Sequence, residues 1–338
     1  MTESIGQTAP AAAQSIDQKI VALFRRMPGG IISGEELGKA LAISRTAVWK
    51  HIKALKELGY QIEAVPSRGY RLIFAPDLLI PAEISAELAT NRIGRKIIYL
   101  KETDSTNFVA FKFAEEGAEE GTVVIAEQQH RGKGRMGRHW ESPYGINLYA
   151  SIILRPPLSP VNAPQLTFLS AVAVAQAIEA TTLLRPAIKW PNDVLVNGMK
   201  VAGLLNEINA ETEKIHFIVL GIGVNINMHR EQFPDALRHP ASSLLLEGGS
   251  PVNRVEFTRA LFTAFDRLYD VYLTRGYNPI REEWLLRSIV SGKRVKISFE
   301  KSETVGLATG IDDYGALLVR HDNGEISRVL AGDVSLLD

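Results

Sequence analysis

The sequence of 338 residues contains no cysteine, so it can form neither a disulfide nor a thiolate metal site. It also lacks a signal-peptide pattern at its N-terminus, and it lacks any apolar run as long as a membrane span. The absence of cysteine does not fix the compartment. The other two absences lead us to expect a cytoplasmic protein that makes no membrane contact.

The chain also lacks a net charge, because 38 Lys and Arg residues balance 38 Asp and Glu residues. No overall field therefore favours an acidic partner. The balance is uneven, since residues 1–75 carry 10 basic and 6 acidic residues and hence a local charge of +4. Hydrophobic residues make up 46% of the chain and charged residues 22%, which is typical of a globular protein with two or three domains.

A glycine-rich basic stretch, AEQQHRGKGRMGRHW, occupies residues 126–140. Its glycines allow the backbone to approach a ligand closely, and its cations could surround a phosphate or carboxylate. The string satisfies G-x-G-x-x-G, but Pro143 and Gly145 lead into an alternating run instead of a helix, which excludes a dinucleotide-binding turn. The P-loop pattern is missing as well. We predict strand–loop–strand; a flexible basic surface loop is the alternative.

The N-terminal quarter of the chain shows the pattern of a winged helix. After small polar residues 1–15, which are typical of a disordered tail, three helical segments follow. A capping box from Ser33 to Glu36 opens the second segment, and Ser44 caps the third. A short hairpin, the wing, completes the domain, which we predict to span residues 16–75.

The third helical segment has a basic outer face, and local positive charge is what phosphate contacts require. We therefore expect this domain to bind DNA; a winged helix used for protein–protein contacts is the alternative. The residues expected to contact DNA are Ser44, Arg45, Thr46, Trp49, Lys50, Lys53 and Arg68.

Two further domains are expected downstream. Residues 76–290 alternate between predicted strands and helices, with a linker and a leading helix at residues 75–90. This alternation favours a mixed sheet with helices packed on it. In residues 291–338, short strands separated by Asp-Tyr-Gly and Asp-Asn-Gly turns indicate a small SH3-like β-barrel. The predicted fold class is α/β (α+β).

The dipeptide Asn197-Gly198 predicts a two-residue hairpin with a type I′ turn. In such a hairpin Lys200 faces Leu195, and Asp193 lies diagonal to Lys200 within its reach. The two charged side chains then either pair with each other or bracket one ligand. A weak surface ion pair is the simpler alternative.

A polar segment at residues 102–107 begins where a predicted strand ends and a helix starts. Ser105 or Thr106 could cap that helix, which is the commoner role of such residues. Their hydroxyls could equally donate to a polar ligand atom. The segment alone leaves both options open.

The motifs D-S-T-N, A-E-Q-Q, G-K-G-R-M-G-R-x-W, K-W-P-N-D, K-V-A-G-L-L and G-I-G-V-N occur in the order found in biotin–protein ligases. The sequence resembles this family over residues 16–338, and its winged helix resembles that of bifunctional members that repress biotin synthesis genes. The resemblance implies a central domain of the class II synthetase-like type. Two positions depart from the family pattern: Lys133 and Met136 stand where arginine is usual or frequent.

The resemblance implies a two-step reaction that uses ATP, with Mg²⁺ accompanying the nucleotide, and biotin as substrate. Biotin's carboxylate attacks the α-phosphate of ATP to give biotinyl-5′-AMP and pyrophosphate. A lysine of an acceptor then attacks the mixed anhydride, and the implied acceptor is the biotin carboxyl-carrier domain of acetyl-CoA carboxylase. Operator DNA and a homodimer formed on adenylate binding are the other implied partners.

The resemblance also assigns roles to individual residues. Those implied as catalytic are Arg135, Lys200 and Asp193. Those implied to bind biotin are Ser105, Thr106, Asn107, Gln129, Lys133, Gly134, Arg135 and Lys200. Those implied to bind ATP or the adenylate are Arg135, Arg138, Trp140, Asn192 and Asn225. No protein-bound metal is implied.

Three other functions stay open at this point. A lipoate ligase shares the fold and the adenylation chemistry, although the D-S-T-N, Q-Q and K-W-P-N-D motifs argue against it. A transcription factor with a ligase-like domain could bind biotin or its adenylate without catalysis, although Arg135, Lys200 and Asp193 argue against lost activity. A ligase could also carry a winged helix that no longer binds DNA.

Overall fold

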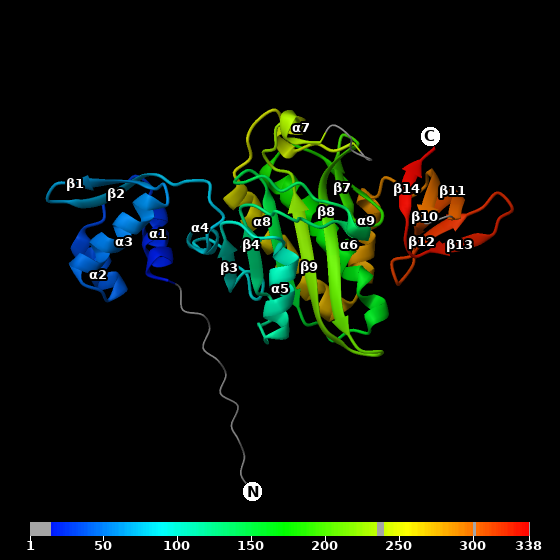
Figure 1. Ribbon diagram of the computed structural model, residues 1–338, viewed down its shortest axis with the longest axis horizontal. Coiled ribbons are helices and arrows are strands. Elements are labelled where there is room, and N and C mark those ends of the chain that lie inside the picture. Colours follow the sequence, from blue (N-terminus) through cyan, green and yellow to red (C-terminus); the bar gives the residue numbers. More distant parts are fainter. Residues whose placement is uncertain (1–14, 235–239, 300–301, 338) are drawn as a thin grey trace, which may run out of the picture. The chain divides into compact units, whose positions relative to one another are not determined.

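The computed structural model of the protein describes residues 15–234, 240–299 and 302–337 (Figure 1). These residues form two compact units. The first comprises residues 15–76 and 80–87, and the second comprises residues 77–79 and the described chain from residue 88 onward. The expected disordered tail, apart from Ser15, lies outside the described residues.

The first unit is a winged helix, as the sequence predicts. It contains α1 Ile16–Arg26, α2 Gly34–Leu41, α3 Arg45–Glu57 and the antiparallel wing strands β1 Gln61–Val65 and β2 Gly69–Phe74. Both predicted caps are present: Ser33 Oγ accepts from the Glu36 N–H at 3.0 Å, and Ser44 Oγ from the Ala47 N–H at 3.2 Å. The inner face of α3 is buried through Val48, Ile52 and Leu55.

The short helix α4, Pro81–Ser85, belongs to the first unit, although the sequence suggests a leading helix of the second domain here. The physical reason is the buried carboxylate of Glu83, which accepts hydrogen bonds from the Tyr60 hydroxyl at 2.5 Å and from Arg25 Nη2 at 2.8 Å. Burial, reinforced by Glu83, raises the pKa of Tyr60, so this hydroxyl stays protonated and donates. These contacts hold α4 to the winged helix.

The second unit is built on a seven-stranded mixed sheet with the order β3-β4-β5-β9-β8-β7-β6. β3 and β4 are parallel and every other neighbouring pair is antiparallel. The predicted mixed sheet is therefore confirmed. Its strands are β3 Ile97–Leu100, β4 Val123–Ala126, β5 Leu148–Leu154, β6 Pro186–Lys189, β7 Asp193–Val196, β8 Met199–Ala210 and β9 Ile215–Val224.

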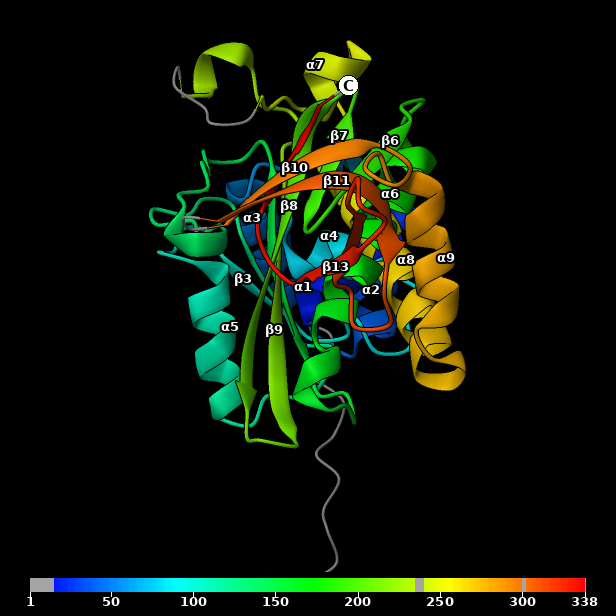
Figure 2. The same cartoon turned by 90° about the vertical axis from the view of Figure 1, so that its right-hand side faces the viewer.

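Helices cover both faces of this sheet (Figure 2). α5, Thr106–Glu115, packs on one face over β4, β5 and β9, where its alanines meet Val124, Ile153 and Phe217. The opposite face carries α6 Pro164–Thr181, α8 Arg254–Arg275 and α9 Asn278–Arg287. The shorter helical segments are α7 Leu244–Gly248 and the 3₁₀ turns Arg135–Gly137, Pro160–Asn162 and Arg230–Gln232.

One helical segment, Pro160–Thr181, is long and apolar enough by length and composition to cross a membrane, which the sequence analysis did not expect. In the fold, 72% of its apolar window is buried inside the protein. Because α6 is covered by the sheet on one side and by α8 and α9 on the other, its apolar surface is accounted for as core.

The C-terminal part is a five-stranded antiparallel sheet with the order β13-β12-β11-β10-β14, consistent with the predicted SH3-like domain. The Trp190 indole N–H donates to the Gly315 carbonyl at 3.0 Å, which ties this domain to the seven-stranded sheet. Its strands are β10 Arg294–Phe299, β11 Ser302–Ile311, β12 Leu317–Arg320, β13 Ile326–Val329 and β14 Asp333–Leu336.

The predicted β7–β8 hairpin is present, and both turn residues have positive φ, as a type I′ turn requires. Leu195 faces Lys200, as expected. Beyond this pair a bulge shifts the register, so that Asp193 faces Gly203. The predicted contact between Asp193 and Lys200 is therefore present, but the regular register from which it was predicted is wrong, because it did not include the bulge.

Candidate active site

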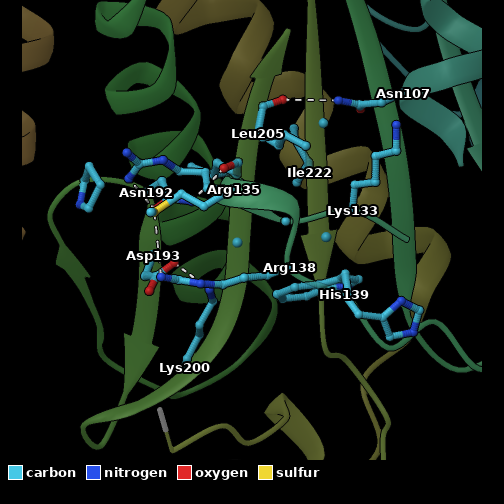
Figure 3. A pocket seen from close by; sticks show the side chains of 18 of the residues that line it. Asn107, Lys133, Arg135, Arg138, His139, Asn192, Asp193, Lys200, Leu205 and Ile222 are labelled. Atoms are coloured by element: carbon cyan, nitrogen blue, oxygen red, sulfur yellow. Dashed lines mark hydrogen bonds and ion pairs between the residues drawn. The ribbon is translucent and has the colours of Figure 1, made fainter. Parts of the chain in front are cut away.

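One cavity brings together most of the residues that the sequence singles out (Figure 3). It encloses about 950 Å³ of space including its open mouth, and the N-terminus of α5, the glycine-rich stretch, strands β5 to β9 and β14 line it. The sequence-predicted residues in its lining are Ser105, Thr106, Asn107, Gln129, Lys133, Gly134, Arg135, Arg138, Trp140, Asn192, Asp193 and Lys200.

The end of the cavity next to α5 is rich in neutral hydrogen-bonding groups, and the Lys133 side chain points toward Asn107 there (Figure 3). Ser105 is the N-cap residue of α5, but its side chain makes no capping hydrogen bond. The cap comes from Gln129, whose Oε1 accepts from the Thr106 N–H at 2.9 Å and faces Thr106 Oγ1 at 3.1 Å. Neither hydroxyl caps the helix, and both residues are almost completely buried.

Asn107 extends this polar end across the sheet. Its Nδ2 donates to Glu207 Oε2 at 2.8 Å and lies 3.4 Å from the Leu205 carbonyl, and its Oδ1 lies 2.6 Å from Ser151 Oγ (Figure 3). The side chain fits only because β9 has Gly221 below it, where a Cβ would lie 2.3 Å from Asn107 Oδ1.

The glycine-rich stretch forms a turn over the cavity between β4 and β5, as the strand–loop–strand prediction requires. The Gly134 N–H donates to the Arg138 carbonyl at 2.7 Å, and the Trp140 N–H donates to the Gly132 carbonyl at 2.9 Å. Met136 has a φ of 56° and is largely exposed. It nevertheless belongs to the lining of the cavity, and its sulfur lies 3.8 Å from Arg138 Nη2.

The two arginines of this stretch have different partners. Arg135 Nη1 donates to Asn192 Oδ1 at 3.3 Å, and burial lowers the pKa of Arg135 while Asp193 and Asp333 raise it. Arg138 donates to both carboxylate oxygens of Asp333 in β14, at 3.0 and 2.5 Å. Arg138, which was expected to contact the adenylate, therefore lines the cavity but forms an ion pair with the C-terminal domain.

The charged pair of the β7–β8 hairpin lies inside the cavity, with Lys200 Nζ 2.6 Å from Asp193 Oδ1. Their side chains are 24% and 16% exposed, which excludes the alternative of a solvated surface pair. Lys200 Nζ also lies 5.4 Å from the centre of the Trp140 ring. Lys200 is therefore held between a carboxylate and an aromatic face, and it faces the cavity.

Lys189 is a cavity residue that the sequence analysis missed. It is the first residue of the K-W-P-N-D motif and pairs in register with Asp193. Burial lowers the pKa of the Lys189 amine, and Lys200 acts in the same direction. The motif itself was the available signal, since all five of its residues line the cavity.

Trp140 forms a wall of the cavity above two glycines that face each other across β8 and β9. A Cβ at Gly203 would lie 2.9 Å from the indole, and a Cβ at Gly223 would lie 2.7 Å from it. Because any side chain at these positions would displace the ring, the two glycines determine where Trp140 sits.

Asn225 does not line the cavity, contrary to expectation. Its Nδ2 donates to the Ser242 carbonyl at 3.1 Å, and its backbone N–H donates to the Val201 carbonyl at 2.8 Å. The Ser242 N–H in turn donates to the Lys200 carbonyl at 2.9 Å. Asn225 therefore supports the backbone beside Lys200 and has its amide occupied.

The residues predicted to contact DNA lie in the winged helix, and all are exposed. Five of them follow Ser44 along the outer face of α3, where Trp49 is 55% exposed and Lys53 Nζ lies 6.0 Å from its ring. Arg68 lies in the turn of the wing. The exposed set is Ser44, Arg45, Thr46, Trp49, Lys50, Lys53 and Arg68, of which four are basic.

Three family models match the chain in the order of its domains. The biotin/lipoate A/B protein ligase family matches residues 99–225, an HTH domain matches residues 17–71, and the biotin protein ligase C-terminal domain matches residues 290–337. The cavity described above is formed mainly by the first of these segments, with β14 contributed by the last.

Similar proteins cover nearly the whole chain. The bifunctional ligase/repressor BirA of Bacillus subtilis is 38% identical over 95% of this chain and 99% of its own length. BirA of Escherichia coli is 31% identical over 95% of this chain and 97% of its own length. Among solved structures, the biotin protein ligase from Aquifex aeolicus in complex with biotin and ATP has a TM-score of 0.61 and 28% identity, covering 71% of this chain and 98% of that one. The chain therefore belongs to the biotin–protein ligase family, in its bifunctional ligase/repressor group.

Proposed function

We propose that the cavity binds biotin and ATP side by side, forms biotinyl-5′-AMP with release of pyrophosphate, and then transfers biotin to a lysine of an acceptor protein. The observation that carries this proposal is one cavity that has neutral hydrogen-bonding groups at its α5 end and the cations Arg135, Lys189 and Lys200 at its other end. A neutral cyclic urea fits the first end. The anionic carboxylate and phosphates fit the second, where preorganised cations offset charge that develops in the reaction.

Individual roles follow from this division. Ser105, Thr106 and Gln129 take the ureido head of biotin, and Lys200 meets its carboxylate next to the α-phosphate. Arg135, which donates to Asn192, faces the phosphoryl group, and Lys189 adds positive charge at this end, whereas Lys133 points toward Asn107 and would lie beside biotin (Figure 3). Trp140 provides a flat wall for the adenylate.

Mg²⁺ enters this scheme with the nucleotide. Within the described residues no cluster of three or more His, Asp or Glu side chains could hold a metal ion. The cavity carboxylates Asp193 and Asp333 already pair with Lys200 and Arg138. A magnesium ion coordinated by ATP phosphates and water fits these residues, because Mg²⁺ commonly keeps such ligands.

The second step requires an uncharged amine close to the mixed anhydride. Asp193 is the candidate for orienting or deprotonating it, since its second carboxylate oxygen is not the one that contacts Lys200. We propose the biotin carboxyl-carrier domain of acetyl-CoA carboxylase as acceptor. A relative from Paracoccus denitrificans, 38% identical over 67% of this chain, is named biotin–[acetyl-CoA-carboxylase] ligase. Because ATP and the carrier domain must both be present, we propose that the protein acts in the cytoplasm.

A single assay tests the reaction. The protein is incubated with ATP, biotin and a carrier domain, and the acceptor mass is measured. We expect an increase equal to biotin minus water, abolished when the acceptor lysine is replaced or ATP is left out. If the acceptor mass does not increase in the complete mixture, the domain only binds its ligand. If lipoate in place of biotin increases the acceptor mass by a lipoyl group, the protein is a lipoate ligase.

Two glycines of β9 provide a matched pair of variants that tests the two ends of the cavity. Gly221→Ala forces a Cβ into Asn107, and Gly223→Ala forces one into Trp140. We expect the first to raise KM for biotin and the second to raise KM for ATP, each by roughly tenfold, because overpacking displaces the contacted side chain. Initial rates with each substrate varied in turn measure both constants. If the two variants change the same constant, the assignment of the ends is wrong.

The winged helix supports a second proposed activity, repression of biotin synthesis genes through operator DNA. One winged helix with a local charge of +4 makes few phosphate contacts, so its affinity alone should be low. Two copies at neighbouring half-sites bind together through effective concentration. In the described sheet β3 and β6 are the edge strands, and pairing of such an edge between two copies would give the dimer.

We expect biotinyl-5′-AMP to drive this dimerisation, because it neutralises the clustered cations of residues 131–138 and fixes the turn that carries them. Biotin with ATP should convert monomer to dimer in sedimentation and strengthen footprinting on the protein's own biotin-gene promoter by about 10²- to 10⁴-fold. Biotin alone and ATP alone are the controls. If the adenylate changes neither association nor DNA affinity, the winged helix acts independently or no longer binds DNA.

A further inference from the structure

The α5 end of the cavity is connected to a carboxylate outside its lining through a chain of hydrogen bonds. The chain runs from Glu207 on β8 through Asn107 and Ser151 to Thr106 and Gln129. Asn107, Ser151 and Thr106 are each at most 4% exposed, so water cannot supply missing protons freely. The direction of each hydrogen bond can therefore be derived from the chemistry of the groups.

The carboxylate fixes the orientation of Asn107. Two atoms face the same end of its amide, Glu207 Oε2 at 2.8 Å and the Leu205 carbonyl oxygen at 3.4 Å. Both are acceptors only, so the amide nitrogen must face them. The amide oxygen then faces Ser151 Oγ at 2.6 Å, and the single hydroxyl proton of Ser151 must point to Asn107.

The other end of the chain is fixed independently. Gln129 Oε1 accepts from the Thr106 N–H at 2.9 Å, and Gln129 Nε2 donates to Ser142 Oγ at 3.0 Å. The Ser142 hydroxyl donates its own hydrogen bond to the Trp140 carbonyl at 2.9 Å. Gln129 therefore presents its oxygen to Thr106 and cannot donate there.

Counting protons between these fixed ends shows a deficit. Three oxygen–oxygen contacts lie in series: Asn107 Oδ1 to Ser151 Oγ at 2.6 Å, Ser151 Oγ to Thr106 Oγ1 at 2.8 Å, and Thr106 Oγ1 to Gln129 Oε1 at 3.1 Å. Only the two hydroxyls carry protons, one each. Ser151 gives its proton to Asn107, so the one proton of Thr106 can serve only one of the two remaining contacts. We assign it to the shorter contact with Ser151, which leaves the longer contact, between the lining residues Thr106 and Gln129, without a proton.

We propose that Glu207 is a specificity-determining positioning residue that sets the donor–acceptor direction of this chain, so that the cavity presents two bare acceptor oxygens to a ligand N–H. A ligand that donates an N–H between Thr106 and Gln129 supplies the missing proton. A carbonyl oxygen at the same place would face two acceptors and be rejected. The inference rests on the proposed function, because the ureido N–H of biotin is the donor that this end would take.

The test exchanges acceptor and donor at the far end of the chain. In Glu207→Gln the new amide can donate, so only the longer 3.4 Å contact with the Leu205 carbonyl still holds the Asn107 amide nitrogen, and the turned-over amide, which donates to Ser151, becomes populated. The hydroxyl protons of Ser151 and Thr106 then shift toward Gln129, and the bare acceptors are lost. We expect the Kd for biotin, measured by calorimetry without nucleotide, to rise about three- to tenfold, with KM for ATP unchanged.

A double variant with unchanged net charge separates the effect of hydrogen-bond direction from the effect of altered packing at position 207. In N107D/E207Q the carboxylate at position 107 accepts from both the amide at position 207 and Ser151, which restores the original direction. Biotin affinity should recover to within about twofold of wild type, whereas N107D alone places two carboxylates in contact and should bind worst. Glu247→Gln is the matched control, because Glu247 accepts from Asn197 Nδ2 at the same 2.8 Å but outside the cavity.

The outcomes are distinguishable. If wild-type protein binds no biotin, the proposed function fails and this inference with it. If wild type binds biotin and E207Q binds equally well, the inference alone is overturned. Loss of biotin affinity in E207Q without recovery in the double variant, or accompanied by an equal change in KM for ATP, shows a merely structural carboxylate and also overturns it.

Discussion

Lys200→Met is expected to slow biotin-dependent exchange between ATP and pyrophosphate on the order of 100- to 1,000-fold, the range seen when one preorganised donor is removed from a reacting centre. Lys200 lies 2.6 Å from Asp193 in the cationic end of the cavity. In the proposed function two anions, the biotin carboxylate and the α-phosphate, meet there. Removal of the amine leaves their repulsion, and that of Asp193, without the cation that offsets it.

Methionine is chosen because it keeps the bulk that Lys200 places beside Trp140, 5.4 Å from the ring centre. Lys112→Met is the control, since Lys112 makes the same kind of contact with Phe108 at 4.5 Å on α5, outside the cavity. Exchange at the wild-type rate in K200M would reduce Lys200 to a partner of Asp193.

Asp193→Asn separates the two steps of the reaction. The amide keeps the shape of the side chain and leaves Lys200 charged, so adenylate formation should change little. Transfer from preformed adenylate to the acceptor lysine should slow markedly if Asp193 orients or deprotonates the amine. ATP–pyrophosphate exchange and biotin transfer, both measured on K200M and on D193N, show whether Lys200 and Asp193 act in one step of the reaction or in both.

The parts of the fold that the sequence predicts well are those governed by local chemistry. The Ser33 and Ser44 caps, the helical periodicity of α3 and the Asn197-Gly198 turn each depend on residues within a few positions. The glycine-rich stretch is located correctly for a related reason: Pro143 and Gly145 exclude a helix after it.

The parts that the sequence does not predict depend on partners far along the chain. The bulge that moves Asp193 opposite Gly203, the pairing of Arg138 with Asp333 and the burial of Lys189 all arise where separate segments pack together. The short helix α4 joins the first unit because Glu83 finds Arg25 and Tyr60, 58 and 23 residues away. No local pattern encodes such distances.

Glu207 illustrates the same limit for function. None of the sequence motifs includes this residue. Its effect on the cavity is visible only when β8, α5 and β5 bring it to Asn107 and Ser151. The motif residues identify the chemistry, and the scaffold residues around them determine which atoms are presented to the ligand.

The largest stability effect is expected at Arg254, whose guanidinium is completely buried. Its Nη1 donates to Glu127 Oε2 at 2.7 Å and to the Asn147 carbonyl at 3.1 Å, and its Nε donates to Asp77 Oδ2 at 3.2 Å. The second oxygen of Glu127, also completely buried, accepts from the Leu79 N–H at 2.9 Å. This network ties residues 77–79 to the end of β4, from which the glycine-rich stretch departs.

Arg254→Leu should destabilise the protein by about 3–5 kcal/mol, because it leaves the Glu127 carboxylate buried without its cation. The midpoint of thermal unfolding should fall by about 10 °C, given about 2–4 °C per kcal/mol for a unit of this size. Calorimetry measures the shift. Arg294→Leu is the control, since Arg294 pairs with Asp322 at 2.8 Å in the same unit but at an exposed site, where loss of the pair costs about 1 kcal/mol or less.

The double variant R254L/E127L decides whether the cost comes from the stranded charge or from lost packing. If the stranded carboxylate dominates, removing it as well should recover much of the midpoint, because a buried ion pair replaced by apolar groups of similar volume is often close to neutral. The double variant also keeps the prediction testable if R254L does not fold. A double variant as unstable as R254L would show that the arginine stabilises the unit through its contacts with Asn147 and Asp77, and that Glu127 does not need a cation.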